Sequence, residues 1–148
     1  MDRCVWSNET SDDVMQITVN VPDRLGRNPK PQTLTVLPQY EEEVRAYADE
    51  VSRHGARMLI LTLGLSVLLV LAAMLPAAGW GRLTLPVAGL LTAAIGGVLI
   101  RYPFATPETI KMMGMRRART VVRWIAGFTV LLGLGLAATG VYVAAAGA

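Results

Sequence analysis

The sequence predicts a mainly α membrane protein, in which three transmembrane helices follow a small cytoplasmic module made of a β-hairpin and a helix. The 148-residue chain is 53% hydrophobic and only 17% charged, whereas about a quarter of the residues of a soluble domain are charged. Three long segments are almost free of charge, and the region before them alternates apolar and polar residues as a strand does. We therefore expect a module at residues 1–57 and a transmembrane region at residues 58–148.

The module is expected to begin with a long-looped hairpin. Residues 15–21 alternate apolar and polar side chains, which predicts a half-buried strand, and residues 33–37 predict a second, shorter one. The proline-rich residues 22–31 between them are expected to form a loop, because proline cannot donate to the hydrogen bonds of a sheet. The apolar positions of the first strand are Met15, Ile17, Val19 and Val21.

A helix is expected to follow the hairpin. Pro38 and the acidic residues 41–43 suit the start of a helix, where proline needs no donor and acids favour the positive end of the dipole. A hairpin and one helix bury little surface, so we expect the module to need the membrane, a second copy or a partner for stability. One face of this helix runs on into the first span and carries Tyr40, Val44, Tyr47, Val51, His54 and Met58.

The three apolar segments predict transmembrane helices at about residues 58–78, 83–100 and 121–146. A helix needs about 20 residues to cross a hydrocarbon core of about 30 Å. The second segment is at the short end of this range, which leaves a buried or re-entrant segment as its alternative. Arg123 lies close enough to the start of the third segment to reach the lipid head groups.

The charges of the links predict the orientation. The link between the first two spans carries Arg82 alone, whereas the segment from Arg101 to Arg123 carries six Lys or Arg residues, both ends included. By the positive-inside rule, the basic link at residues 101–120 is cytoplasmic, which places the N-terminus inside and the C-terminus outside. The first 25 residues contain no apolar stretch typical of a cleavable signal peptide, which agrees with this orientation. The expected location is the cell membrane, as a multi-pass protein.

Charge and residue content exclude several classes of function. Residues 1–57 have a net charge of −3 and residues 58–148 of +6, so the basic excess lies in the apolar region and indicates membrane orientation rather than nucleic acid binding. Cys4 is the only cysteine and His54 the only histidine, so no metal site or disulfide is expected within one chain. We also expect no cofactor and no enzyme activity, because no catalytic motif is present and no acidic residue lies within a span.

Small residues recur along one face of the second and of the third span. Such lines allow helix backbones to approach closely in lipid. We favour packing of these helices against each other, and packing against another subunit is the alternative. The expected packing residues are Gly89, Ala93 and Gly97 on the second span, and Gly133, Ala137, Gly140 and Ala144 on the third.

The basic link is expected to contain a helix that begins at Thr106 and Pro107. Its arginines are interpreted as orientation signals that reach toward lipid phosphates, with contact to an anionic head group or an acidic partner as the alternative. The acidic module is expected to dock on this link, with Glu41, Glu42 and Glu43 facing it and Ile17, Val19 and Val21 supplying apolar contact. The arginines concerned are Arg116, Arg117, Arg119 and Arg123.

The leading hypothesis for function is a small integral membrane protein that acts as an accessory, scaffolding or interaction subunit of a larger membrane assembly. The alternative is a homo-oligomeric pore or transporter for a small neutral solute, lined by hydroxyl groups. A further alternative is a membrane regulatory sensor in which a ligand or pH changes the contact between module and link. The expected partners are the lipid bilayer and either another protein or further copies of the chain. The hydroxyl residues for a pore are Thr62, Ser66, Thr92, Thr129 and Thr139.

Overall fold

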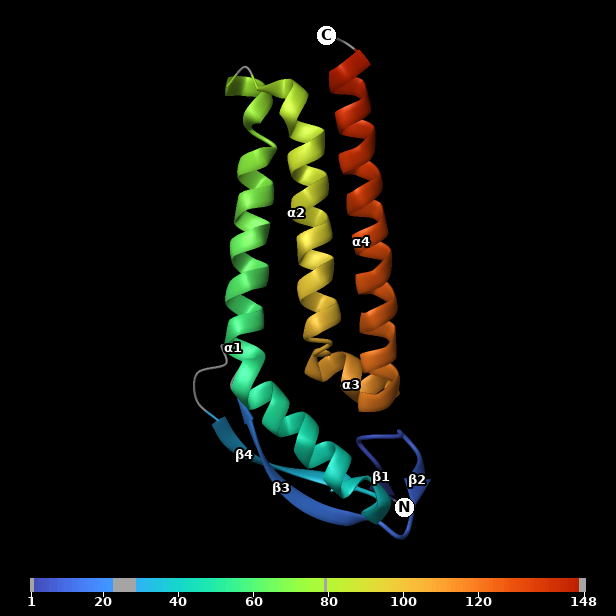
Figure 1. Ribbon diagram of the computed structural model, residues 1–148. Coiled ribbons are helices and arrows are strands. Elements are labelled where there is room, and N and C mark those ends of the chain that lie inside the picture. Colours follow the sequence, from blue (N-terminus) through green and yellow to red (C-terminus); the bar gives the residue numbers. More distant parts are fainter. Residues whose placement is uncertain (1, 23–28, 79, 147–148) are drawn as a thin grey trace. The chain divides into compact units, whose positions relative to one another are not determined.

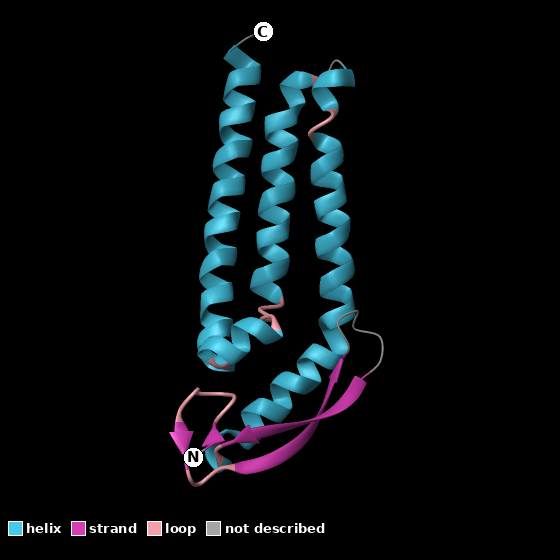
Figure 2. Cartoon of the chain, turned by 180° about the vertical axis from the view of Figure 1, so that it is seen from behind, coloured by secondary structure: helices cyan, strands magenta, loops and turns pink. Residues whose placement is uncertain are grey.

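The computed structural model describes residues 2–22, 29–78 and 80–146. Most of these residues are helical, and two small antiparallel sheets lie near the N-terminus (Figure 1, Figure 2). The expected mainly helical fold with an N-terminal two-strand sheet is therefore confirmed. In chain order the elements are β1 (Asp2–Arg3), β2 (Thr10–Ser11), β3 (Met15–Pro22), β4 (Pro29–Val36), η1 (Pro38–Tyr40), α1 (Glu41–Ala72), η2 (Leu75–Ala78), α2 (Gly81–Arg101), α3 (Pro107–Met113) and α4 (Met115–Ala146).

The chain divides into two compact units, whose limits differ from the expected boundary after residue 57. The first unit combines Met1–Leu59 with Tyr102–Val122, and the second combines Ile60–Arg101 with Arg123–Ala148. The link that joins α2 to α4 thus folds with the N-terminal module. The physical reason is that the small module has too little apolar surface of its own, and residues of the link complete its core.

The β3–β4 hairpin is longer than expected. Its register runs from Met15 opposite Val36 to Pro22 opposite Pro29, so the expectation that residues 22–31 all form a loop was wrong, and residues 23–28 lie outside the described part. The carbonyl of Thr35 accepts a hydrogen bond from the amide of Val5, so the backbone of Thr35 points away from β3. Pro31 and Pro29, four and six positions earlier in that register, share this orientation. The prolines of β4 therefore occupy positions where no ladder donor is needed.

A second, shorter ribbon precedes the hairpin and was not expected from the sequence. β1 pairs with β2 in an antiparallel register of two residues on each strand. Residues 5–7 form the turn between them, and Asn8, which follows it, has a φ of 68°; asparagine tolerates this left-handed conformation better than most residues do. The amide of Cys4 donates to the carbonyl of Glu9 at 2.8 Å, and the amide of Asn8 donates to the carbonyl of Cys4 at 2.9 Å.

The core of the first unit forms between the hairpin and the start of α1, which lies along β3 and β4 (Figure 1). Ile17 and Val36 from the hairpin and Val44 from α1 are fully buried, as the period of two in the strand and of three to four in the helix predict. Phe104 and Ile110 of the link pack against this core. The buried members of the core are Cys4, Trp6, Ile17, Val19, Val36, Val44, Tyr47, Ala48 and Met115.

The link contains two helices rather than the single one expected. α3 begins as predicted, because the side chain of Thr106 accepts a hydrogen bond from the amide of Thr109 at 3.4 Å. It ends at Gly114, whose φ of 80° is open to glycine and strained for other residues. The backbone then turns into α4, so the predicted arginine face belongs to a separate helix that begins at Met115.

Within the described residues, three helices are long and apolar enough to cross a membrane. The first ends at Ala72 instead of continuing to residue 78. The amide of Ala73 is shared between the carbonyls of Leu69 and Val70, that of Met74 bonds to the carbonyl three residues back, and Pro76 has no amide hydrogen. The second is an uninterrupted helix of 21 residues. The third, α4, begins before the expected residue 121 and has 32 residues.

Candidate functional site

The start of α4 is joined to the N-terminal ribbon by backbone hydrogen bonds. The amide of Met115 donates to the carbonyl of Val5 at 3.0 Å, and the amide of Arg116 donates to the carbonyl of Trp6 at 3.1 Å. The first amides of a helix have no partner within the helix. Carbonyl groups of the N-terminal segment therefore accept hydrogen bonds from amides that have no partner within α4.

Aromatic side chains connect the ribbon, α1 and the link around Tyr47. The centre of the Tyr47 ring lies 6.4 Å from that of Trp6 and 6.1 Å from that of Phe104, both in edge-to-face geometry. The hydroxyl of Tyr47 accepts a hydrogen bond from the amide of Ala105 at 3.3 Å. Farther along α1, the imidazole of His54 stacks on Tyr102 at 5.6 Å. These contacts fix the link against α1 at several points.

One arginine of the predicted basic face belongs to this arrangement. Nη2 of Arg119 lies 3.6 Å from Oε2 of Glu50, and the guanidinium carbon lies 5.1 Å from the centre of the Tyr47 ring. This geometry combines an ion pair with a cation–π contact. Arg119 thereby holds α4 and α1 together, so its role within the described residues is structural.

The module thus packs on the link, but with a different acid from those expected. Glu41 forms an ion pair of 2.8 Å with Arg45 on its own helix, while Glu50 pairs with Arg119. Ile17 and Val19 lie in the core that residues of α1 and Met115 of the link also enter. The side chain of Val21 lies outside the described part. Aromatic contacts and main-chain hydrogen bonds, rather than the acidic cluster, join the module to the link. Exposed ion pairs are individually weak.

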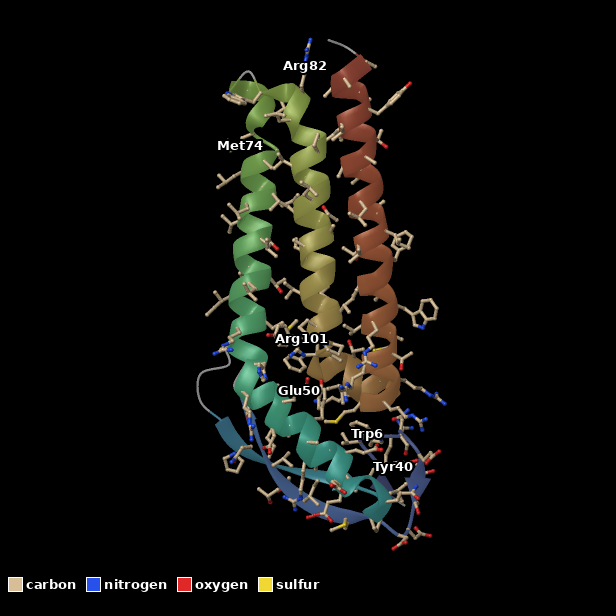
Figure 3. All side chains as sticks on the ribbon, viewed as in Figure 1. Trp6, Tyr40, Glu50, Met74, Arg82 and Arg101 are labelled. Carbon is tan, nitrogen blue, oxygen red and sulfur yellow. The ribbon has the colours of Figure 1, made fainter. Side chains whose placement is uncertain are left out.

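Two grooves lie on the surface of the first unit beside Tyr40 and Arg116, which line both (Figure 3 labels Trp6, Tyr40 and Glu50). The first has a volume of about 470 Å³ and the second of about 670 Å³. We call the first the Tyr47 groove, and it is lined by Trp6, Tyr40, Glu43, Ala46, Tyr47, Glu50, Arg116 and Arg119. We call the second the Arg117 groove, and it is lined by Ser7, Glu9, Tyr40, Met113, Arg116, Arg117, Thr120 and Val121.

The remaining predicted arginines differ in their surroundings. Arg116 and Arg117 are exposed, and among the described residues neither forms an ion pair. Arg123 is also exposed on α4 but belongs to the second unit. Sequence reasoning grouped these side chains with Arg119 because helical spacing alone cannot reveal which of them meets an acid on another segment.

Sequence reasoning did not identify Trp6 as a site residue. Its segment has no periodic pattern, and only its large aromatic side chain in a polar stretch could have drawn attention to it. Trp6 is 6% exposed and lines the Tyr47 groove. Its indole nitrogen is buried and has no hydrogen-bond partner among the described residues.

In the second unit, the small residues bring α2 and α4 into backbone contact. A Cβ on Gly89 would lie 2.6 Å from the carbonyl oxygen of Gly133, and one on Gly133 would meet Ala93. Ala137 also lies against Gly89, and a Cβ on Gly140 would lie 2.6 Å from the nitrogen of Pro86. Glycine is therefore needed at these crossings, where an added methyl group would force the backbones apart.

Gly97 does not lie in this contact, contrary to the expectation. A Cβ there would have nothing within 4 Å, whereas one on Gly96 would lie 2.9 Å from the carbonyl oxygen of Ala126. Seven residues after Gly89, an α-helix returns close to the same face, while eight residues turn it by about 80°. Ala144, the last residue of the predicted line on α4, is partly buried.

The hydroxyl groups considered for a pore are largely used within their own helices. Four of them donate to the carbonyl four residues back at 2.8 to 2.9 Å. The hydroxyls of Thr62 and Thr84 are buried, and neither has a hydrogen-bond partner among the described residues. The four that bond to their own backbone are Ser66, Thr92, Thr129 and Thr139.

Cys4 is buried in the first unit, where its Sγ accepts a hydrogen bond from the amide of Leu37 at 3.3 Å. Burial alone would raise the pKa of the thiol, but hydrogen bonds from Ser7, Leu37 and Trp6 outweigh burial and lower the pKa below its usual value. Within the described part of the chain, no three His, Cys, Asp or Glu residues are grouped as metal ligands would be.

Comparisons of this chain with protein-family models, with curated proteins and with solved structures found no significant match.

Proposed function

We propose that this chain is an integral membrane interaction protein, an accessory subunit that holds a protein partner in the Tyr47 groove. The composition of that groove carries the proposal. Trp6, Tyr40 and Tyr47 line it together with Arg116 and Arg119. Tryptophan, tyrosine and arginine are the residues most enriched at the energetic centres of protein interfaces, because they combine large apolar area with polar groups.

The construction of the first unit supports this role, because it provides a rigid frame for the groove. Its walls come from the N-terminal ribbon, from α1 and from the start of α4. Arg119, Glu50 and Tyr47 restrain each other, so little side-chain freedom is left to be lost when a partner binds. Glu43 and Arg116 remain as groove charges without an ion pair among the described residues. A partner segment with an apolar side chain flanked by a basic and an acidic residue fits this pattern.

The same unit supports an orientation with the N-terminus in the cytoplasm and the C-terminus outside the cell membrane. Residues 1–59 and 102–122 fold into one unit, and two apolar helical segments separate them along the chain. They must therefore lie on the same side of a membrane that both segments cross. The six basic residues from Arg101 to Arg123 favour the cytoplasmic side.

The experiment purifies the tagged full-length chain from its native membranes in mild detergent and measures the mass and composition of the complex. Ala46→Trp fills the Tyr47 groove, and Glu43→Lys reverses a charge in it. Glu42→Lys is the matched control, because Glu42 is an exposed neighbour on α1 that does not line this groove. We expect a second chain to co-purify in a fixed ratio with the wild-type protein and with Glu42→Lys. The amount of this second chain should fall by more than about tenfold with Ala46→Trp.

Two results would contradict the proposal. A preparation that contains only this chain would remove the accessory-subunit role, and a complex of several copies would support the homo-oligomer instead. Retention of the second chain by both Ala46→Trp and Glu43→Lys would mean that the partner binds elsewhere.

A further inference from the structure

The Arg117 groove has a chemistry distinct from that of the Tyr47 groove. Arg116 and Arg117 extend from the first turn of α4 into it, and among the described residues no acid pairs with either guanidinium. Arg119, three residues after Arg116, is held by Glu50 and Tyr47. Two adjacent arginines are thus left with unused donors, and paired guanidinium groups match the oxygens of a phosphate.

The other lining groups suit a phosphate that carries organic substituents. Ser7 and Thr120 add polar lining to the groove. Met113 and Val121 add apolar surface at the edge of the groove. With two arginines and Glu9, the lining has a net charge of +1. This charge complements a group with a single negative charge, as in a phosphate diester.

The position of the groove along α4 favours a lipid as the source of that phosphate. Arg117 precedes Trp124, where the uncharged part of α4 begins, by seven residues. A cluster of Lys and Arg residues directly before a membrane-spanning helix attracts anionic lipid head groups. The place of Arg116 and Arg117 in the sequence therefore favours a lipid over free phosphate.

We propose that the Arg117 groove binds the head group of an anionic phospholipid. Arg116 and Arg117 bind the phosphate oxygens, and Met113 and Val121 contact the glycerol and the first acyl carbons. This inference is independent of the protein partner proposed for the Tyr47 groove, because Arg117 and Ser7 line only the present groove.

The experiment uses the full-length chain in detergent with equal amounts of phosphatidylglycerol and phosphatidylcholine and counts retained lipids by native mass spectrometry. We expect one retained phosphatidylglycerol, preferred over phosphatidylcholine by at least about fivefold. Arg117→Gln and Arg116→Gln should each lower this preference about fivefold. Lys111→Gln is the matched control, because it removes the same charge from an exposed residue outside the groove, and its effect should stay within about twofold.

Three results would overturn the inference. The first is the absence of any preference for phosphatidylglycerol in the wild-type protein, which needs no variant to interpret. The second is an equal loss with Lys111→Gln and Arg117→Gln, which would indicate general attraction to negative charge. The third is displacement of the lipid by millimolar inorganic phosphate, which would mean that the groove takes free phosphate.

Discussion

Gly114 lies directly against the main chain of Trp6. A Cβ added to Gly114 would be 2.8 Å from the carbonyl oxygen of Trp6, which is shorter than real side chains allow. The same carbonyl accepts the amide hydrogen of Arg116 at 3.1 Å. Glycine is therefore required at position 114 for two reasons, which are its φ of 80° and the close approach of the N-terminal segment.

Replacing Gly114 by alanine should destabilise the first unit by about 2 kcal/mol, because a positive φ costs a residue with a Cβ about 1–2 kcal/mol before any steric clash. Hydrogen exchange of the amides of Met115 and Arg116 reports the loss directly, since both bond to the N-terminal segment. Gly127→Ala is the control, because a Cβ there meets nothing within 4 Å. Unchanged protection in Gly114→Ala would show that the ribbon is not held at this place.

The contact between α2 and α4 predicts a sharp difference between two neighbouring glycines. Gly96→Leu places a side chain against the carbonyl of Ala126 and against Val130, whereas Gly97→Leu projects into open space. We expect Gly96→Leu to lower stability by about 1–3 kcal/mol, the usual cost of overpacking, and Gly97→Leu to have little effect. Thermal unfolding in detergent compares the two variants. A larger loss for Gly97→Leu would mean that this face packs on another subunit.

Arg119 and Glu50 should show measurable energetic coupling. Their side chains are 26% and 35% exposed, so solvent screens the pair, and we expect a coupling energy of about 0.5–1 kcal/mol in a double-mutant cycle with Arg119→Gln and Glu50→Gln. Arg119→Lys should also destabilise the unit, because an ammonium group does not reproduce the planar contact with Tyr47. Additive single effects in the cycle would show that the pair contributes nothing.

The lowered pKa of Cys4 predicts how the stability of the first unit depends on pH. The folded unit releases the thiol proton at a lower pH than the unfolded chain, whose cysteine has a pKa of about 8.5. Between these two pKa values the unfolded chain binds more protons, so the free energy of unfolding rises with pH across this window. The added stability is lost as the pH falls through the folded pKa. The free energy of unfolding, measured at a series of pH values below about 8.5, should therefore rise more steeply with pH for wild type than for Cys4→Ser.

Labelling of single cysteines tests the orientation, in a Cys4→Ser background. Trp80→Cys and Ala146→Cys replace exposed residues next to the ends of the apolar helices, and Lys111→Cys replaces an exposed residue of α3. A maleimide that cannot cross membranes should label the first two in intact cells and Lys111→Cys only after permeabilisation. Labelling of Lys111→Cys in intact cells would contradict the orientation that the basic link predicts.

The parts of the fold that depend on local pattern could be predicted from the sequence. An uncharged stretch of helical residues and an alternating strand are properties of their own segments, so the apolar helices and the β3–β4 hairpin were recognised. The N-cap of α3 at Thr106 was found for the same reason. The ribbon of β1 and β2 was missed, because strands of two residues contain no period to detect.

The parts that depend on contacts between distant segments could not be predicted. Gly114 breaks a helical pattern only because the N-terminal segment packs against it, and a glycine within such a pattern is otherwise tolerated. The choice of Gly96 over Gly97 depends on where α4 meets α2. Likewise, Arg119 could be separated from Arg116 and Arg117 only once Glu50 and Tyr47 were placed beside it.

The division of the first unit between two stretches of the chain affects its biosynthesis. Trp6 and Tyr47 are made early, but Met115, which shares their core, follows only after α2. At about 5–20 residues per second, translation from residue 59 to Met115 takes roughly 3–11 s. Throughout this interval the nascent N-terminal segment lacks part of its core. A chain that failed to insert α2 would keep an unfinished apolar surface, which is what chaperones and proteases recognise when they sort newly made proteins.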